Sequence, residues 1–388
     1  MPRERIIGLA VNHGFAYYRD VLRAIVSWAE IRPHWSFIFL NPVFDRNTRE
    51  ALKHVDAAVV AIDSRESYDA LPKGVVVVDV SDEVLGILGP RVANDNALVG
   101  QLAAQHFLQR GLRSFGYVGQ SQYRFSAERE AAMRSTVEAA GHRLAVYEFC
   151  TSTHEIAPMS YLVSPNTDLA DWLLSLPLQT GVLAMCDHWA VEVLQICRDV
   201  GLRVPEDIAV LGVDDDEFYC QLARPALSSV ILASEAIGLR AAELIDSLLG
   251  KSNKRRKLAP EILLPPVGVV TRRSTDVLAV NEPNVVAAIR FIRENCNRPI
   301  DVSDVLKEVP VSRRWLERRV QDVLGITLGA EIRRVRIERA KRLLLQTKHS
   351  IADVAQHSGF TDIRHIENCF RAELGLTPTQ FRRSATGG

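Results

Sequence analysis

The chain has 388 residues, and its 47 Lys and Arg balance 47 Asp and Glu, so the formal net charge is zero. A hydrophobic content of 47% and a charged content of 24% are typical of globular proteins, and the length allows two or three domains. No apolar run reaches the ~20 residues of a membrane span, and the apolar start Ile6–Val11 is shorter than the ~7–15 residues at the core of a secretion signal. We therefore expect a cytoplasmic protein with no membrane partner.

The six cysteines are scattered, and no two of them have the spacing of a metal site or a redox pair. We expect reduced thiols, no metal and no cofactor. The sequence also lacks a nucleophile elbow, a phosphate-binding loop and a pair of catalytic acids, so it gives little support to an enzyme.

Short apolar runs alternate with amphipathic segments from residue 5 to residue 249. This alternation predicts parallel β-sheets with helices on both faces, and continuous Val and Ile runs such as Val75–Val78 are typical of buried parallel strands. The predicted strands are Ile6–Val11, Ser36–Leu40, Ala57–Ile62, Val75–Val80, Phe115–Val118, Leu144–Phe149, Gly181–Met185 and Ile208–Val213. The predicted helices are Tyr17–Ile31, Asn96–Arg110, Ala127–Ala140, His188–Val200 and Ser234–Leu249.

Polar side chains follow several of the predicted strands. Ligands of parallel sheets collect at the carboxyl ends of the strands. Asp, Asn and Arg offer paired acceptors and donors for adjacent hydroxyl groups, and an aromatic ring offers a flat apolar face to a sugar. The candidate ligand-binding residues are Asn12, His13, Arg19, Asp95, Asn96, Arg129, Asp187, Trp189 and Asp214. Taken one at a time, such residues also serve as helix caps, and Trp189 also fits a core position.

A boundary is predicted where the core pattern stops. Asn281-Glu282-Pro283 is a turn signal ahead of a helix that starts near Asn284. We expect a sensor domain at 1–276, a linker at 277–283 and a second domain at 284–388.

The last hundred residues contain one helical design twice, fifty positions apart. Leu324-Gly325-Ile326-Thr327-Leu328 recurs as Leu374-Gly375-Leu376-Thr377-Pro378. Each copy predicts a short helix, a turn and a second helix. Ser312 and Thr361 are the expected N-caps of the second helices, and Gly325 and Gly375 are their expected stops.

The outward faces of the two second helices carry guanidinium, amide and acidic groups. Such groups read base edges and grip phosphates when a helix enters the major groove. The candidate DNA-binding residues are Ser312, Arg313, Arg314, Glu317, Arg318, Thr361, Asp362, Arg364, His365 and Asn368.

A helix is predicted between the two copies, at Leu328–Gln346, with Leu328, Ile332, Val335, Arg339 and Leu343 on one face. Its length of roughly 28 Å is close to the ~34 Å between successive major-groove faces on one side of a duplex. From residue 281 onward, 19 Lys and Arg stand against 13 Asp and Glu, so the neutral chain has a basic end that suits DNA. The alternative is a helical bundle with a solvated charged surface.

Residues from about Val285 to Arg383 resemble the arabinose-regulator (AraC-type) DNA-binding domain. The resemblance is carried by Ser350–Ala355, Gly359–Asp362 and Gly375–Arg382. Ile366 departs from it, because the family usually has an aromatic residue at that position. The resemblance implies an all-α domain with two helix-turn-helix units.

The preceding part resembles the sugar sensors of lactose-repressor-type regulators and periplasmic sugar-binding proteins. Matching motifs are Val92–Asn96, Gly201–Asp214, Leu227–Val230 and Val270–Thr275, and Cys186 replaces a usual ligand-binding Asn. The resemblance implies a two-lobed, periplasmic-binding-protein-like α/β domain with the ligand at or beside Asp95, Arg129, Asp187 and Asp214.

The two domains in this order resemble bacterial regulators of xylose operons. The resemblance implies a pentose effector, with xylose as the first expectation. We also expect an operator in double-stranded DNA, a homodimer because paired half-sites add affinity, and RNA polymerase as a partner if the protein is an activator. Repression by the sugar-free protein is the other possible sign of regulation. The alternative function is a DNA-binding regulator whose sensor recognises a non-sugar metabolite or a protein partner.

Overall fold

The computed structural model describes residues 4–30, 34–84, 89–149, 167–249, 261–276, 283–324, 326–347 and 349–386. The chain forms two compact units, one made of Met1–His106 and Arg113–Asp276 and the other of Phe107–Leu112 and Val277–Gly388. The expected linker 277–283, apart from Pro283, lies outside the described residues, as do Cys150 and the predicted helix stop at Gly325. Within the described part, no helix is both long and apolar enough to cross a bilayer.

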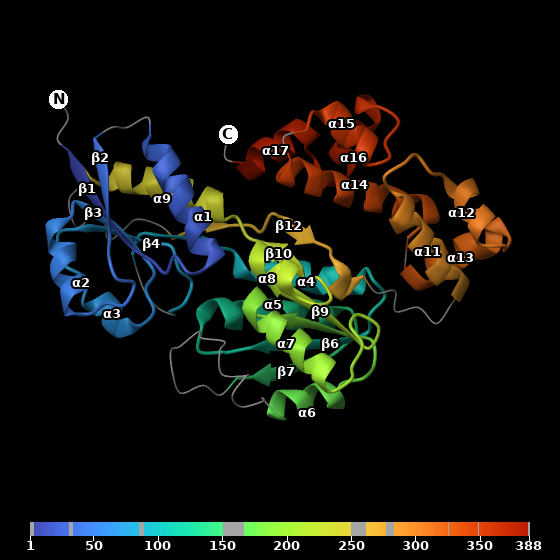
Figure 1. Cartoon of the computed structure of the whole chain (residues 1–388), viewed down its shortest axis with the longest axis horizontal. Helices are drawn as coiled ribbons and strands as arrows, with labels where there is room; N and C mark the ends of the chain where they lie inside the picture. Colours follow the sequence, from blue (N-terminus) through green and yellow to red (C-terminus); the bar gives the residue numbers. More distant parts are fainter. Residues whose placement is uncertain are drawn as a thin grey trace. The chain divides into compact units, whose positions relative to one another are not determined.

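The first unit has two lobes, each built on a six-stranded sheet (Figure 1). In the first lobe the strand order is β11-β5-β4-β3-β1-β2, and the pairings along it are parallel. The strands are β1 (Arg5–Ala10), β2 (Trp35–Phe39), β3 (Ala57–Val60), β4 (Val76–Asp79), β5 (Arg91–Asn94) and β11 (Glu261–Leu264).

Helices cover both faces of the first sheet because its strands are apolar on both sides. Ile7, Leu9 and Val59 pack against α1 (Ala16–Ala29) and α9 (Ser234–Leu249). Ala10 and Val60 face the opposite way, into a core near α2 (Arg46–Ala51), the 3-10 turn Leu52–His54 and α3 (Arg65–Asp69). The first lobe is therefore a three-layer α/β/α structure.

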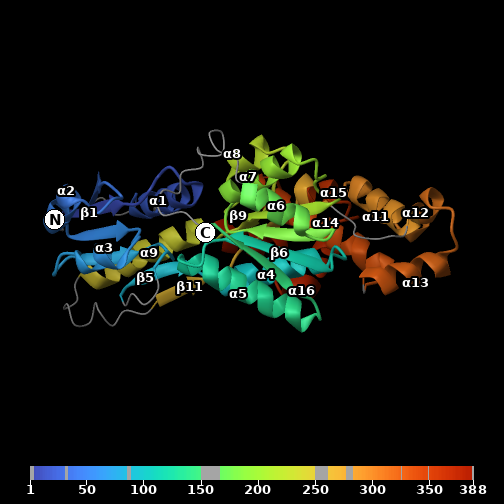
Figure 2. The same ribbon diagram turned by 90° about the horizontal axis from the view of Figure 1, so that it is seen from below.

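The second lobe repeats this plan with the strand order β12-β10-β9-β8-β6-β7. All its pairings are parallel except β10 with β12. Helices α6 to α8 lie on one side of the sheet and α4 and α5 on the other (Figure 2). The strands are β6 (Ser114–Gly119), β7 (Leu144–Glu148), β8 (Thr180–Ala184), β9 (Ile208–Val213), β10 (Ser228–Ile231) and β12 (Gly268–Val270). The helices are α4 (Asn96–Leu108), α5 (Arg124–Ala139), α6 (Thr167–Ser175), α7 (Asp187–Asp199) and α8 (Glu217–Leu222), and a 3-10 turn spans Arg273–Thr275.

The expected parallel sheets with helices on both faces are confirmed, and every predicted strand and helix of this unit has a counterpart. The elements that the sequence did not predict are short. β5 spans four residues and begins and ends with the polar Arg91 and Asn94, which form no apolar run. β12 spans three residues and adds the antiparallel edge that an alternating pattern does not indicate.

The second unit contains α11 (Pro283–Asn295), α12 (Val302–Glu308), α13 (Arg313–Leu324), α14 (Leu328–Gln346), α15 (Ile351–His357), α16 (Ile363–Leu374) and α17 (Pro378–Thr386). Two apolar cores lie along α14. Leu328 and Ile332 belong to the core of α11, α12 and α13, whereas Ala340 and Leu344 belong to the core of α15, α16 and α17. Helix α14 therefore joins two small helical cores, as the repeat predicts.

The buried face of α14 leaves the line of the predicted face in its second half. Arg339 is only half-buried, and its Nε donates to the carbonyl oxygen of His357. The buried line passes instead through Ile337, Ala340 and Leu344. The face rotates because the two ends of α14 pack on different helices.

The N-cap of α16 is Asp362, where Thr361 was expected. The Oδ1 of Asp362 accepts from the backbone N–H of His365 at 2.7 Å, and the Thr361 hydroxyl lies beside the His365 ring. At an N-cap, an Asp carboxylate stabilises the exposed helix N–H groups more than a Thr hydroxyl does. The predicted cap at Ser312 is present, since its Oγ accepts from the backbone N–H of Trp315 at 3.3 Å.

Candidate functional site

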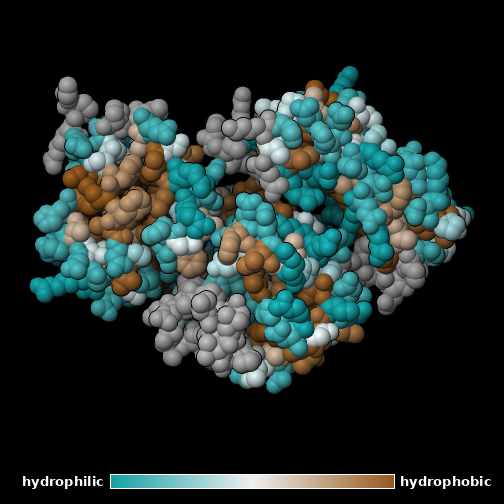
Figure 3. All heavy atoms as spheres, in the orientation of Figure 1, coloured by the Kyte–Doolittle hydropathy of each residue, from teal (hydrophilic) through white to brown (hydrophobic). Residues whose placement is uncertain are grey.

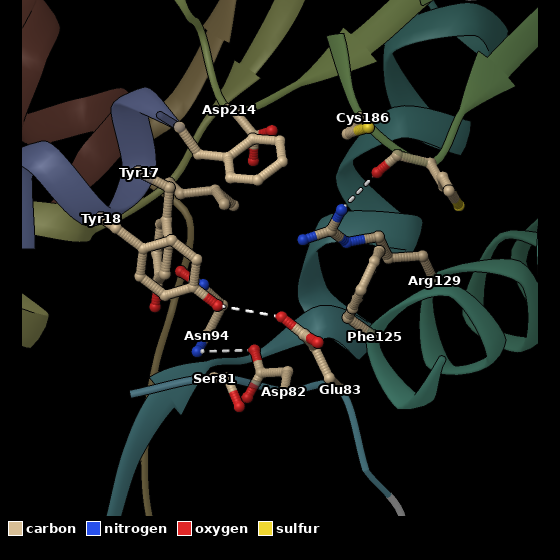
Figure 4. Close-up of a pocket in the computed structure, with 13 residues that line it drawn as sticks. Tyr17, Tyr18, Ser81, Asp82, Glu83, Asn94, Phe125, Arg129, Cys186 and Asp214 are labelled. Carbon is tan, nitrogen blue, oxygen red and sulfur yellow. Dashed lines mark hydrogen bonds between the residues drawn. The ribbon is translucent and has the colours of Figure 1, made fainter. Parts of the chain in front are cut away.

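A pocket lies between the two lobes of the first unit, and its lining residues follow the carboxyl ends of strands (Figure 4). Its empty volume, part of which is open to solvent, is about 650 Å³. The lining residues are Phe15, Tyr17, Tyr18, Ser81, Asp82, Glu83, Asn94, Phe125, Arg129, Met185, Cys186, Asp214 and Leu232. Parallel sheets bind their ligands at the carboxyl ends of the strands, as at this pocket.

Arg129 is held rigidly at one side of the pocket. It is 3% exposed, its Nε donates to Asn96 Oδ1 at 2.9 Å, and its Nη1 donates to the carbonyl oxygen of Met185. The guanidinium lies over the ring of Phe125, 4.9 Å from the ring centroid. Figure 4 shows it reaching toward the middle of the lining residues. A fixed cation with several N–H groups suits oxygen acceptors of a polar ligand.

Three carboxyl groups share the pocket with this cation. Burial raises the pKa of Asp82 to about 6 and that of Glu83 to about 7. Burial also raises the pKa of Asp214 to about 7, although the positive charge of Arg129 opposes that rise. Carboxyl groups in this range can accept hydrogen bonds when ionised and donate one when protonated, which suits a ligand rich in hydroxyl groups.

Aromatic side chains from the start of α1 complete the pocket. The hydroxyl of Tyr18 donates to Glu83 Oε1 at 3.0 Å, and the hydroxyl of Tyr17 donates to the carbonyl oxygen of Val80 at 2.9 Å. Burial raises the pKa of both tyrosines well above the usual value, so their hydroxyls stay protonated. With Phe15 and Phe125, these rings offer apolar faces beside hydrogen-bonding groups, the combination that sugar rings require.

The loop after β9 has an unusual backbone. Asp214 and Asp215 have φ angles of +112° and +55°, a region that residues other than glycine rarely occupy. Strained residues of this kind persist where surrounding contacts hold them and gather at functional sites. One such contact is the ion pair between Asp215 and Arg272 at 2.8 Å.

Of the nine predicted ligand residues, Arg129 and Asp214 line the pocket. Asn96 and Asp187 lie behind it, both almost fully buried: Asn96 binds Arg129, and Asp187 accepts from the hydroxyl of Ser229 at 2.5 Å. Burial and the nearby Asp214 raise the pKa of Asp187 well above its usual value.

The other predicted residues do not line the pocket. Asp95 caps α4, because its Oδ1 accepts from the backbone N–H of Leu98 at 3.0 Å. Trp189 is buried against Phe149, with ring centroids 3.7 Å apart. Asn12 and His13 are exposed beside Arg19, whose Nη1 donates to the carbonyl oxygens of His13 and Gly14.

Sequence reasoning missed several lining residues. Ser81, Asp82 and Glu83 follow β4, so the rule applied to the other strand ends would have found them. Asn94 is the last residue of β5, a strand that the sequence did not predict. Cys186, which replaces a usual ligand-binding Asn, also lines the pocket. Burial raises the pKa of its thiol well above the usual range, so the thiol stays protonated.

Two ion pairs and two backbone hydrogen bonds join the lobes around the pocket. Arg19 of the first lobe pairs with Asp216 of the second at 3.7 Å, and Arg124 of the second pairs with Glu261 of the first at 2.5 Å. The backbone N–H groups at the start of α5 donate to the carbonyl oxygens of Asp82 and Glu83 at 2.9 and 3.0 Å. The two backbone hydrogen bonds therefore tie the lobes together at the loop that supplies Asp82 and Glu83.

The second unit carries the predicted DNA-binding side chains on exposed faces. At the start of α13, Ser312, Arg313 and Arg314 are exposed, and Glu317 pairs with Arg313 at 2.8 Å. Thr361, Asp362, Arg364 and Asn368 are exposed at the start of α16, with His365 half-buried between them. On the face drawn in Figure 3, hydrophilic side chains cover most of this unit. Each helix-turn-helix thus presents the beginning of its second helix to solvent, the part that reads a major groove.

Two families match parts of the chain. Residues 104–275 match the periplasmic binding protein-like domain, and residues 305–384 match the helix-turn-helix domain. The xylose operon regulatory protein of Escherichia coli (strain K12) is 31% identical over 395 residues, covering 98% of this chain and 97% of that protein. The xylose operon regulatory protein of Haemophilus influenzae is 32% identical, covering 76% of this chain and 74% of that protein.

Solved structures agree with these matches. A structure described as the xylose-binding transcription activator xylR has a TM-score of 0.60 and 30% identity, and 98% of each chain is covered. A LacI family transcriptional regulator from Enterococcus faecalis with bound ribose has a TM-score of 0.56 over 71% of this chain, and its 18% identity supports the fold of the first unit alone. These relatives are transcription regulators. The chain belongs to the family of xylose operon regulatory proteins.

Proposed function

We propose that the chain is a xylose-responsive transcription regulator that binds double-stranded DNA through its two helix-turn-helix units. The observation that carries this function is the pocket in which Arg129 faces Asp82, Glu83 and Asp214 among aromatic rings, in a chain that also presents two exposed second helices. The names of the full-length relatives support xylose as the effector. Of the nine predicted ligand residues, Arg129 and Asp214 line the pocket and are the proposed direct contacts with the sugar. The ten DNA residues of the sequence analysis remain the predicted contacts with DNA.

The pocket chemistry suits a small sugar. Adjacent hydroxyl groups of a pentose can donate to one carboxylate and accept from one guanidinium, and both groups are fixed in the pocket before the ligand enters. Groups that are already positioned cost little entropy on binding. Phe15 and Phe125 provide apolar surface for the C–H side of the ring.

Regulation follows if the sugar and the DNA favour the same state of the protein. Sugar held by both lobes stabilises the state in which the lobes are joined. If DNA favours the same state, sugar raises the affinity for DNA, and DNA raises the affinity for sugar by the same factor. A coupling of ~1–3 kcal/mol, roughly 5–150-fold, is typical of such proteins. We propose activation of pentose catabolic genes, with RNA polymerase as the partner.

The protein is expected to act in the cytoplasm as a homodimer, with a sensor at 1–276, a linker at 277–283 and a DNA-binding domain at 284–388. Two copies on paired half-sites gain affinity because the second contact becomes intramolecular. Light scattering of the purified chain at micromolar concentration tests the dimer. The mass of a single chain under those conditions contradicts it.

Thermal unfolding of the full chain with a panel of sugars tests the effector. A ligand at about 100 times its Kd stabilises the folded protein by about 2.7 kcal/mol, so D-xylose is expected to raise the Tm of the sensor by several degrees. D-Glucose and D-ribose at equal concentration serve as controls. A Tm that no sugar changes contradicts the sugar sensor and favours a regulator with a different metabolite or a protein partner.

A further inference from the structure

Buried hydrogen bonds hold the last buried residues of the sensor unit in place. Ser274 and Thr275 belong to the 3-10 turn that ends this unit, their side chains are fully buried, and the chain leaves the unit after Asp276. The hydroxyl of Ser274 donates to the carbonyl oxygen of Val210 at 2.6 Å and accepts from the backbone N–H of Ser228 at 2.8 Å. The turn is therefore anchored to β9 and β10.

Thr275 lies in a buried chain of hydrogen bonds with a single direction. Its hydroxyl donates to Ser228 Oγ at 2.7 Å, and the hydroxyl of Ser228 donates to the carbonyl oxygen of Arg272 at 3.0 Å. Nε2 of His106 lies 2.9 Å from Thr275 Oγ1. Because the Thr275 hydrogen points to Ser228, the hydrogen of the His106 contact is on Nε2, and His106 is the donor.

One end of this chain of hydrogen bonds is connected to the pocket through β10. Ser229, the neighbour of Ser228, donates to Asp187 Oδ1 at 2.5 Å and accepts from the backbone N–H of Asp215 at 3.0 Å. Arg272, three residues before Thr275, pairs with Asp215 at 2.8 Å. The strained loop that carries Asp214 is thus tied to β10 through Ser229 and to the segment that ends the sensor through Arg272.

The other end leads to the pocket through α4. This helix begins at Asn96, which accepts from Arg129, and its residue His106 is also the point where the chain first leaves the unit. Ten residues of helix between them span about 15 Å. Near its start α4 packs tightly on α5, because a Cβ on Gly100 would overlap the carbonyl oxygen of Arg129.

We infer that the His106–Thr275–Ser228 cluster transmits effector binding from the pocket to the DNA-binding unit. One route from the pocket runs through Asp214–Asp216 and β10, and the other runs through Arg129 and α4. Both routes meet at this cluster, where the chain leaves the sensor. Thr275 and His106 are positioning residues that touch neither sugar nor DNA. This role rests on the proposed function, since it assumes that sugar changes DNA affinity.

The test replaces Thr275 by Val, which keeps the shape of the side chain and removes the hydroxyl, and by Ser, which keeps the hydroxyl. Thr180→Val is the matched control, because the Thr180 hydroxyl is also fully buried in the same sheet and donates to Ser114 Oγ at 2.8 Å, outside the cluster. The measurements use the full chain: the Kd for D-xylose, and the Kd for a selected DNA duplex with and without D-xylose.

The DNA ratio is the Kd for DNA without D-xylose divided by the Kd with it. Wild type and Thr180→Val are expected to have the same DNA ratio, within the ~5–150-fold range of coupled sites. Thr275→Val should bind D-xylose within about threefold of wild type, yet its DNA ratio should fall to about one, and Thr275→Ser should restore most of the ratio. If Thr275→Val keeps the wild-type ratio, or if Thr180→Val loses it equally, the inference is overturned. If wild type itself shows no effect of sugar on DNA affinity, the proposed function fails first.

Discussion

Arg129 is the one cation among the described residues that line the pocket, and three carboxyl groups share the pocket with it. Its contacts with Asn96 and Met185 fix the guanidinium before any ligand enters. Because Arg129 also lowers the electrostatic cost of a charged Asp214, it contributes to the ligand contact and to the ionisation of the pocket.

Arg129→Ala is expected to weaken D-xylose binding by a hundredfold or more, about 2.7 kcal/mol, since it removes charged hydrogen bonds from a buried site. Arg134→Ala on the same helix, at a half-exposed position paired with Glu130, is the control and should leave the affinity unchanged. Calorimetric titration of both variants measures the effect. Wild-type affinity in Arg129→Ala would show that the sugar binds elsewhere.

Asp82→Asn is expected to change the pH dependence of stability. Burial raises the pKa of Asp82 from 3.8 to about 6, so the folded protein keeps this proton at pH values where the unfolded chain has lost it. Stability from this group is present below about pH 4 and is lost as the pH rises to about 6, by up to about 3 kcal/mol. The Tm of the wild type should therefore fall relative to that of Asp82→Asn over this range. Parallel curves would contradict the raised pKa.

At this scale the sequence predicted Arg129 and Asp214 because each follows a strand that an apolar run made visible. It did not predict Asn94, because β5 is a four-residue strand with two polar residues. Asn12 follows the same rule as Asp214 but lies in an exposed turn, and the predicted Asp95 caps a helix instead of lining the pocket. Which polar residue faces the pocket depends on packing between the lobes, and a local pattern does not contain that information.

At the scale of elements, the repeated helix-turn-helix was the strongest feature of the sequence. The capping boxes at Asp301 and Ser350 begin α12 and α15 in equivalent ways. The turn after α15 requires glycine at position 359, where φ is +70° and a Cβ would lie 2.5 Å from the carbonyl oxygen of Arg298. The rotation of the buried face along α14 was missed because one helical period does not describe a helix that packs on two cores.

Gly359→Ala should lower the stability of the second unit by about 1–3 kcal/mol, because the added Cβ meets backbone atoms at a positive φ. Gly329→Ala in α14 is the matched control, since a Cβ there meets nothing within 4 Å, and alanine favours a helix by about 0.5–1 kcal/mol. Calorimetry of the full-length variants compares their Tm values. Equal Tm values for the two variants would contradict the account of the turn.

Arg314→Ala should weaken DNA binding by roughly 5–150-fold, which corresponds to the ~1–3 kcal/mol of one base or phosphate contact. The Kd of this variant for D-xylose should stay unchanged. Arg198→Ala, an exposed arginine on α7 of the sensor, removes the same charge and should bind DNA as wild type does. Fluorescence anisotropy with a labelled duplex at several salt concentrations measures both. An equal loss in the two variants would mean that only net charge matters.

At the scale of the whole molecule, a neutral chain combines an acidic sensor with a basic DNA-binding end. The order of the two folds was predictable, because alternating strands and helices precede a helical repeat. The meeting of two routes at His106 and Thr275 was not, because those residues are far apart in sequence and have no pattern in common. We propose that the binding of effector and the binding of DNA are coupled in this protein.

The most direct test is the Kd of the full chain for a duplex selected from a random pool, measured with saturating D-xylose and with a sugar that leaves the Tm unchanged. D-Xylose is expected to lower the DNA Kd by at least about fivefold, the lower end of typical coupling. An identical Kd in the two sugars, or a higher Kd in D-xylose, would contradict this expectation.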